Sequence, residues 1–164
     1  MMLRVGLSNM DIRLAHPNEA SRLSEIARQA KRHWGYPEAW MRAWEAELTL
    51  TAVFIEQFPV FVIEIDGGIA GFCALSDAAG EWEIEHFWIL PAFMGRGAGA
   101  RLFRHAAAAL ASRGIKRFKI VSDPHAEGFY QKMGARRVGA VASSIPGRAL
   151  PVLMYEMGVG ELMG

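Results

Sequence analysis

The chain has 164 residues, 52% hydrophobic and 21% charged, a composition that predicts one globular domain over 1–164 with a hydrophobic core. A net charge of +1 argues against a general nucleic-acid-binding protein, and no uninterrupted apolar run reaches the ~18 residues of a membrane helix. The N-terminus lacks the apolar run of a signal peptide, and the lone Cys73 allows neither an intramolecular disulfide nor a metal cluster. We therefore expect a cytoplasmic protein that binds neither a membrane nor a metal.

The first half of the chain predicts a strand, two helices and a hairpin. Residues 11–15 form the strand, and the turn residues that follow begin a helix with apolar residues at helical spacing. Pro37 suits the first turn of a second helix that continues to Leu48. The run 58–65 alternates and contains β-branched residues, an Asp-Gly-Gly turn typical of a hairpin follows it, and 69–75 is the returning strand.

The second half predicts four strands and two helices. Strands are expected at 81–90, 117–122, 137–143 and 150–157. A helix carries one apolar stripe from Leu102 to Leu110, and a short helix runs through Met133 until Gly134 stops it. The order strand-helix-helix-three strands-helix-strand-helix-two strands predicts a mixed α/β sheet with no linker.

A glycine-rich turn separates the strand ending near Ile89 from the following helix. It contains Gly95, Gly97 and Gly99, with Arg96 among them. Backbone N–H groups at a helix start lack internal partners, and glycines let an anion approach them closely. The surrounding window 86–122 contains seven basic residues and no acid, which favours an anionic ligand over a solvated basic helix face. The fingerprints of dinucleotide-binding and phosphate-loop folds are absent.

Two linked motifs resemble the GNAT superfamily, the acetyl-CoA-dependent N-acetyltransferases. The first is Ile89-Leu-Pro91 followed by Met94-Gly-Arg-Gly97-Ala-Gly99, and the second is Asp123-Pro-His-Ala126-Glu-Gly-Phe129-Tyr130-Gln-Lys-Met-Gly134. Met94 departs from the Arg or Gln that this family prefers, and Asp123 replaces Asn. The resemblance implies a mixed, mostly antiparallel central sheet with flanking helices and an acyl-CoA N-acyltransferase fold.

The resemblance also implies acetyl-CoA as the acetyl donor, bound where the strand ending at Ile89 and the strand ending near Ser122 separate. Pantetheine would pair with the backbone of Phe87 and Ile89, and the diphosphate would take the N–H groups of the glycine turn. The expected cofactor-binding residues are Phe87, Trp88, Ile89, Gly95, Arg96, Gly97, Ala98, Gly99, Ala100, Asp123 and Tyr130.

Three residues are candidates for the chemistry that the resemblance implies. Glu83 is the expected general base, with Glu85 in reserve on the same strand face; the alternative is that both face water. Tyr130 holds the family's general-acid position, although its place on an apolar helical stripe also fits a packing role. His86 is expected on the opposite face of the strand, in a structural role.

The acceptor is the least defined part of the prediction. The leading hypothesis is direct transfer of acetyl to a primary amine of a small molecule or peptide. A protein N-acetyltransferase and a non-catalytic acyl-CoA sensor of the same fold are the alternatives. Trp34, Tyr36 and Arg148 are the candidate substrate residues, although such aromatics are often core. The resemblance also leaves a homodimer open.

Overall fold

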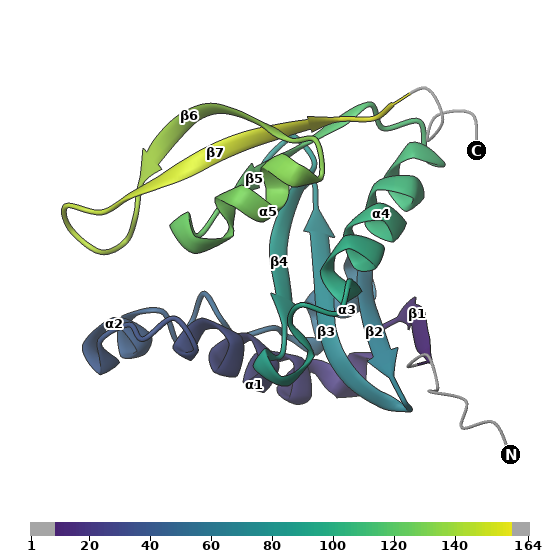
Figure 1. The fold of residues 1–164 in the computed structure, drawn as a ribbon, viewed down its shortest axis with the longest axis horizontal. Coiled ribbons are helices and arrows are strands. Elements are labelled where there is room, and N and C mark those ends of the chain that lie inside the picture. The colour runs from purple at the N-terminus through teal and green to yellow at the C-terminus, as the bar shows by residue number, and fades with distance from the viewer. Residues whose placement is uncertain (1–8, 159–164) are drawn as a thin grey trace, which may run out of the picture.

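A seven-stranded sheet in the order β1-β2-β3-β4-β5-β7-β6 organises residues 9–158, the part of the chain that this computed structural model describes (Figure 1). Every neighbouring pair is antiparallel except β4 and β5. The expected mixed, mostly antiparallel sheet is confirmed. The strands are β1 (Met10–Leu14), β2 (Val60–Ile65), β3 (Gly68–Ser76), β4 (Glu83–Ile89), β5 (Arg117–Val121), β6 (Arg136–Ala142) and β7 (Ala149–Glu156).

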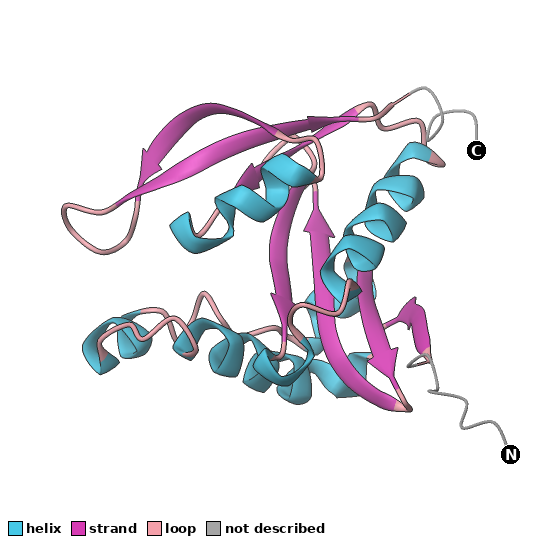
Figure 2. Cartoon of the chain, viewed as in Figure 1, coloured by secondary structure: helices cyan, strands magenta, loops and turns pink. Residues whose placement is uncertain are grey.

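Five α-helices flank the sheet, and no helix within residues 9–158 is long and apolar enough to cross a membrane (Figure 2). They are α1 (Ala20–Arg32), α2 (Glu38–Ala43), α3 (Ala52–Gln57), α4 (Ala98–Ala111) and α5 (Glu127–Lys132). Short 3₁₀ turns precede three of these elements: η1 (Pro17–Glu19), η2 (Pro91–Phe93) and η3 (Pro124–Ala126).

Two helical expectations need correction. The second helix ends at Ala43, because Trp44 leaves the helical region with φ −90° and ψ 1° and the chain continues as turns. The helix α3 was not expected at all. Its six residues bury only Ile55, too little for a helical period, and its start depends on the Thr51 side chain accepting a hydrogen bond from Phe54 N–H.

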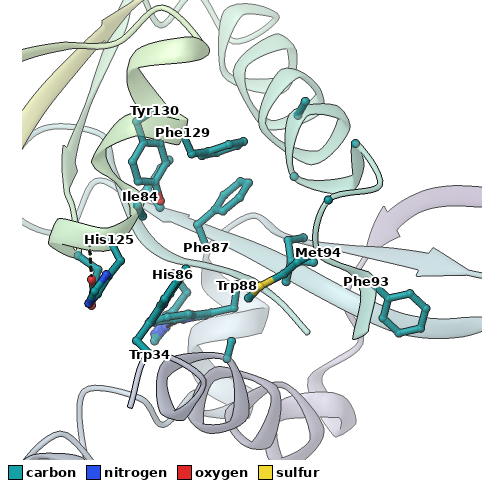
Figure 3. A pocket seen from close by; sticks show the side chains of 18 of the residues that line it. Trp34, Ile84, His86, Phe87, Trp88, Phe93, Met94, His125, Phe129 and Tyr130 are labelled. Carbon is teal, nitrogen blue, oxygen red and sulfur yellow. Dashed lines mark hydrogen bonds between the residues drawn. The ribbon is translucent and has the colours of Figure 1, made fainter. Parts of the chain in front are cut away.

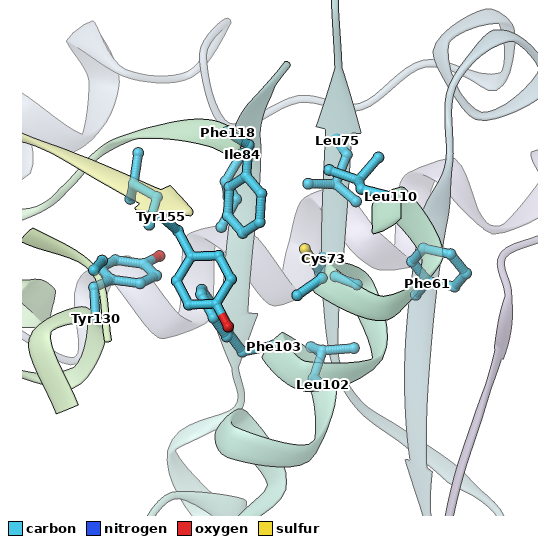
Figure 4. Packing of buried hydrophobic residues seen from close by; sticks show 14 of the residues in the cluster. Phe61, Cys73, Leu75, Ile84, Leu102, Phe103, Leu110, Phe118, Tyr130 and Tyr155 are labelled. Atoms are coloured by element: carbon cyan, nitrogen blue, oxygen red, sulfur yellow. The ribbon is translucent and has the colours of Figure 1, made fainter. Parts of the chain in front are cut away.

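Apolar side chains on the two faces of the sheet form two cores. Phe61, Ile63 and Ile65 of β2 pack in the cluster with α4 and α5, whereas Val60 and Val62 pack in the cluster with α1, α2 and α3. This alternation is the period of two that a strand covered on both faces requires. Figure 4 shows the α4-side cluster, where Cys73 lies fully buried as a small apolar residue.

Strand β4 contains the irregularity that shapes the functional site. Its parallel pairing with β5 covers only Glu83 with Lys119 and Ile84 with Ile120, so the two strands separate beyond Ile84. On its other edge, Ala74 pairs with His86 and Leu75 pairs with Ile84, which leaves the intervening residue as a β-bulge.

The bulge changes which face the following residues occupy. Ile84 and Phe87 both belong to the α4-side cluster, while Trp88 packs on the α1-side cluster and His86 contacts the ring of Phe72. Strict alternation would have placed Ile84 and His86 on one face. The expectation that His86 lies opposite Glu83 and Glu85 depended on that alternation, which fails at residue 85.

Candidate active site

A cavity of about 510 Å³ opens where β4 and β5 separate (Figure 3). Its walls come from β4, the turn before α4, the η3–α5 segment and the end of α1. Nine of the expected cofactor-binding residues line it: Phe87, Trp88, Ile89, Gly95, Gly97, Gly99, Ala100, Asp123 and Tyr130. The other two lie beside it, since Ala98 is buried under the helix start and the Arg96 guanidinium lies 5.5 Å from the ring of Phe93.

The three glycines of the turn have two different physical roles. Gly95 and Gly97 have φ values of 78° and 83°, in the left-handed region that glycine adopts without strain. A Cβ on either of them would meet no protein atom within 4 Å, so the backbone there faces open space. Gly99 is different, because its Cβ would lie 3.3 Å from the Phe129 ring, and it allows α4 to approach α5 closely.

The start of α4 can therefore accept an anion. Gly97 is the N-cap and offers no side chain to the first-turn N–H groups, which have no partners within the helix. The partial positive charge of the 14-residue helix adds to these donors. The residues present fit a diphosphate at this turn.

The two candidate bases occupy different positions. Glu85 lines the cavity, whereas Glu83 does not and lies 3.9 Å from the Nζ atom of Lys119. Removal of water raises the pKa of Glu85, and the charge and hydrogen bond of Glu83 raise it further, against smaller opposing effects of Ser76 and Lys119. A carboxylate of raised pKa in a cavity suits proton transfer, so the geometry favours the residue expected as the reserve.

Tyr130 packs in the core and also reaches the cavity. Its ring packs against Phe87 and Phe103 at centroid distances of 5.9 and 6.2 Å, and the residue is 5% exposed. Its hydroxyl nevertheless points from α5 into the cavity, toward Ile84 (Figure 3). Burial, with smaller effects of Cys73 and Asp123, raises the pKa of the phenol far above its ordinary value. Tyr130 therefore stays protonated at neutral pH, and its O–H can donate a hydrogen bond in the cavity.

The candidate substrate residues gather around Asp123. Trp34 lines the cavity and stacks on His125, with ring centroids 4.8 Å apart and planes 5° from parallel. Tyr36 donates a hydrogen bond of 2.9 Å to Asp123 and accepts one of 2.7 Å from Arg148 Nη2. These contacts join the loop after α1, the turn after β5 and the β6–β7 hairpin into one wall.

Lys31 completes this wall and was missed from the sequence. Its Nζ atom lies 2.7 Å from Asp123 Oδ2 and 4.2 Å from the ring centre of Trp44. Burial alone would raise the pKa of Asp123, but Lys31, the His125 N–H and Tyr36 hold it below its usual value. The spacing was an available signal, since Lys31 follows Ala27 by four residues on the buried stripe of α1.

The contacts of Asp123 show what an aspartate does at this position, where the family motif has an asparagine. Its Oδ1 atom accepts a hydrogen bond of 2.9 Å from His125 N–H, so it caps the turn η3 as the expected asparagine would. Its negative charge, which an asparagine would not bring, is paired with Lys31. An aspartate therefore caps η3 as an asparagine would and also forms an ion pair with Lys31 of α1.

A helix start that can accept an anion, two strands that separate, and a protonated tyrosine around one cavity are the features of an acyl-CoA-dependent transferase. The chain belongs to the acetyltransferase (GNAT) family, whose model matches residues 21–135. A Bacillus subtilis (strain 168) protein named for N-acetylation of the alanine of ribosomal protein bS18 is 32% identical over 81 residues, which are 48% of this chain. The matched region spans 54% of that relative.

Solved structures share the fold over nearly the whole chain. A GCN5-related N-acetyltransferase from Rhodopseudomonas palustris superposes with a TM-score of 0.76 at 21% identity, covering 94% of this chain and 99% of its own. The PaiA N-acetyltransferase from Thermoplasma acidophilum, crystallised in complex with coenzyme A, gives 0.71 at 17% identity, covering 91% and 99%. The acyl-CoA N-acyltransferase fold expected from the motifs is confirmed.

Proposed function

We propose that the protein transfers an acetyl group directly from acetyl-CoA to a primary amine of a small molecule or peptide. One observation carries the proposal: a single cavity connects the open glycine turn before α4 with Glu85 and Tyr130. Bound acetyl-CoA supplies the acetyl group as a thioester. The N–H groups from Gly95 to Ala100 hold its diphosphate, and the backbone of Phe87 and Ile89, freed where β5 diverges, orients the pantetheine.

Glu85 prepares the acceptor amine in this proposal. A lysine-like ammonium of pKa ~10.4 is only about 0.04% neutral at pH 7, so a base must remove a proton before the nitrogen can attack. The raised pKa of Glu85 brings it closer to working pH than an ordinary carboxylate. Glu83, which is hydrogen-bonded to Glu85, is the reserve and supplies negative charge that attracts the cation.

Tyr130 acts as the acid toward the departing sulfur. Its hydroxyl lies in the cavity, and burial keeps the phenol protonated, so its O–H donates a hydrogen bond along which the proton can pass to the sulfur as the C–S bond breaks. The aromatic wall of Trp34 and the Asp123 cluster, which includes Tyr36 and Arg148, would contact the acceptor.

A protein N-acetyltransferase is the second candidate, favoured by the similarity to the relative named for the bS18 alanine. The sensor alternative is disfavoured, because a sensor needs no carboxylate of raised pKa in the cavity. A panel of small amines and of peptides with N-terminal alanine separates the candidates when CoA release is followed with a thiol reagent.

We expect acceptor-dependent CoA release that Glu85→Gln reduces by on the order of 10²-fold. Glu81→Gln is the matched control, because Glu81 also contacts Lys119, at 3.3 Å, but does not line the cavity. Tight acetyl-CoA binding with no release above background for any amine would indicate the sensor instead.

A further inference from the structure

His86 and Trp88 form a hydrogen bond within the cavity wall. The two residues lie two positions apart on β4, and both line the cavity (Figure 3). Trp88 Nε1 is 3.2 Å from His86 Nδ1. An indole N–H can only donate, so the Nδ1 atom of His86 must be the acceptor and carries no proton. The single proton of the neutral ring is therefore on Nε2.

The surroundings keep the imidazole neutral. Burial lowers the pKa of His86 to about 4, which rules it out as an efficient base at neutral pH. Its ring lies against Phe72 of β3 at 5.7 Å. Among residues 9–158, no hydrogen bond from Nε2 to a protein group is found, and the residue lines the cavity. His86 therefore has an Nε2–H donor available at the cavity, while its Nδ1 atom is held by Trp88.

The position of His86 along β4 indicates what this donor would meet, if the proposed function holds. With the diphosphate on the turn at 95–99, pantetheine follows β4 back toward the point where β5 rejoins it. That point is the pair Ile84 and Ile120. The thioester then lies beside residues 85–86, next to the bulge and within the cavity that also holds the Tyr130 hydroxyl.

We propose that His86 Nε2–H donates a hydrogen bond to the acetyl carbonyl oxygen, and that Trp88 is the positioning residue that fixes this tautomer. The carbonyl oxygen gains negative charge as the amine attacks, and a donor already aimed at it stabilises that charge without reorganisation. A neutral imidazole serves here as a donor only. It exchanges no proton with the substrate, so the proton movements remain those of Glu85 and Tyr130.

The direct test measures the carbonyl itself and needs no acceptor. The infrared stretch of acetyl-CoA labelled with ¹³C at the carbonyl is compared when bound to the wild type, to His86→Phe and to His86→Gln. We expect a lower frequency in the wild type than in His86→Phe, and partial recovery in His86→Gln, which retains an N–H donor. Equal frequencies in all three proteins would overturn the inference and leave the proposed function standing. Absence of acetyl-CoA binding to the wild type would overturn both.

A second measurement isolates the role of Trp88. The ¹⁵N chemical shifts of the His86 ring at pH 7 should show a proton on Nε2 in the wild type and a mixture of tautomers in Trp88→Phe. A proton on Nδ1 of the wild type would contradict the proposal, whatever the activity.

Steady-state kinetics distinguish a catalytic role of His86 from a binding or packing role. His86→Phe should lower kcat by on the order of 10²-fold, the effect of one lost donor, while the KM for acetyl-CoA changes little. The control His105→Phe alters an exposed histidine on α4 that contacts Phe61 outside the cavity, and should leave kcat unchanged. A loss confined to KM would make His86 a binding or packing residue. If His86→Phe fails to fold, His86→Gln and the ¹⁵N shifts still decide the question.

Discussion

Lys31 Nζ and Asp123 Oδ2 lie 2.7 Å apart although 92 positions separate the two residues in the chain. Their side chains are only 10% and 8% exposed. The pair joins the end of α1 to the turn after β5 at the edge of the cavity. Arg148 approaches the same carboxylate to 3.5 Å, so the β6–β7 hairpin is attached to the pair as well. Side-chain charges with little exposure thus hold together α1, the turn after β5 and the β6–β7 hairpin.

Breaking this ion pair should destabilise the whole domain. Lys31→Ala leaves the buried carboxylate of Asp123 without its main partner, and we expect the free energy of unfolding to fall by about 3–5 kcal/mol. Urea unfolding measures the change. The matched control is Arg136→Ala, which removes an exposed pair with Glu156 (3.1 Å, 68% and 59% exposed) and should cost under ~1 kcal/mol. Equal losses in the two variants would show that the buried pair has no special role.

The raised pKa of Glu85 should lower the stability of the folded protein at neutral pH. Its folded-state pKa is raised, so between the unfolded and folded values the folded protein binds more protons, and stability falls as pH rises through that window. Glu85→Gln removes the effect. We expect a higher Tm than the wild type at pH 7, with a gap that narrows as the pH is lowered through the raised pKa of Glu85. Scanning calorimetry at several pH values checks this, and a lower Tm at pH 7 would contradict it.

Tyr130→Phe separates proton donation from packing. The variant keeps the ring that packs on Phe87 and Phe103 and removes only the hydroxyl. We expect kcat to fall by about 10²-fold or more, with the Kd for acetyl-CoA within about twofold of the wild type. Steady-state kinetics and calorimetry provide the two numbers. Parallel losses of turnover and affinity would indicate that the hydroxyl supports the shape of the cavity.

Local features of this fold could be predicted from the sequence because each has a local cause. The strands and the helix α4 follow from short-range periodicity, and the turn at 95–99 was predicted to bind an anion because its glycines and basic surroundings are contiguous. The two roles of those glycines could not be separated. Gly99 is required by Phe129, thirty positions later, whereas the positive φ of Gly97 belongs to the turn itself.

The rest of the site depends on pairing between distant segments. The bulge at Glu85 exists only in the register of β4 against β3, so no pattern within β4 predicts that it reverses the faces of the strand. For the same reason His86 was expected on the face opposite Glu83. Glu83 was preferred as the base because of the resemblance to the family, and the choice between Glu83 and Glu85 stays a prediction. The ion pair of Lys31 with Asp123 likewise needs the complete sheet to bring α1 beside the end of β5.

Calorimetric titration with acetyl-CoA tests the central claim most directly, because that claim places the diphosphate on the backbone at Gly97. Gly97→Asn puts a side chain that tolerates positive φ into the open space before α4, and Gly114→Asn makes the same change at the other end of that helix, where φ is 77° and a Cβ also meets nothing within 4 Å. We predict that the wild type and Gly114→Asn bind acetyl-CoA alike and that Gly97→Asn loses at least about tenfold in affinity, or ~1.4 kcal/mol. Unchanged affinity in Gly97→Asn, or no binding by the wild type, would contradict the account.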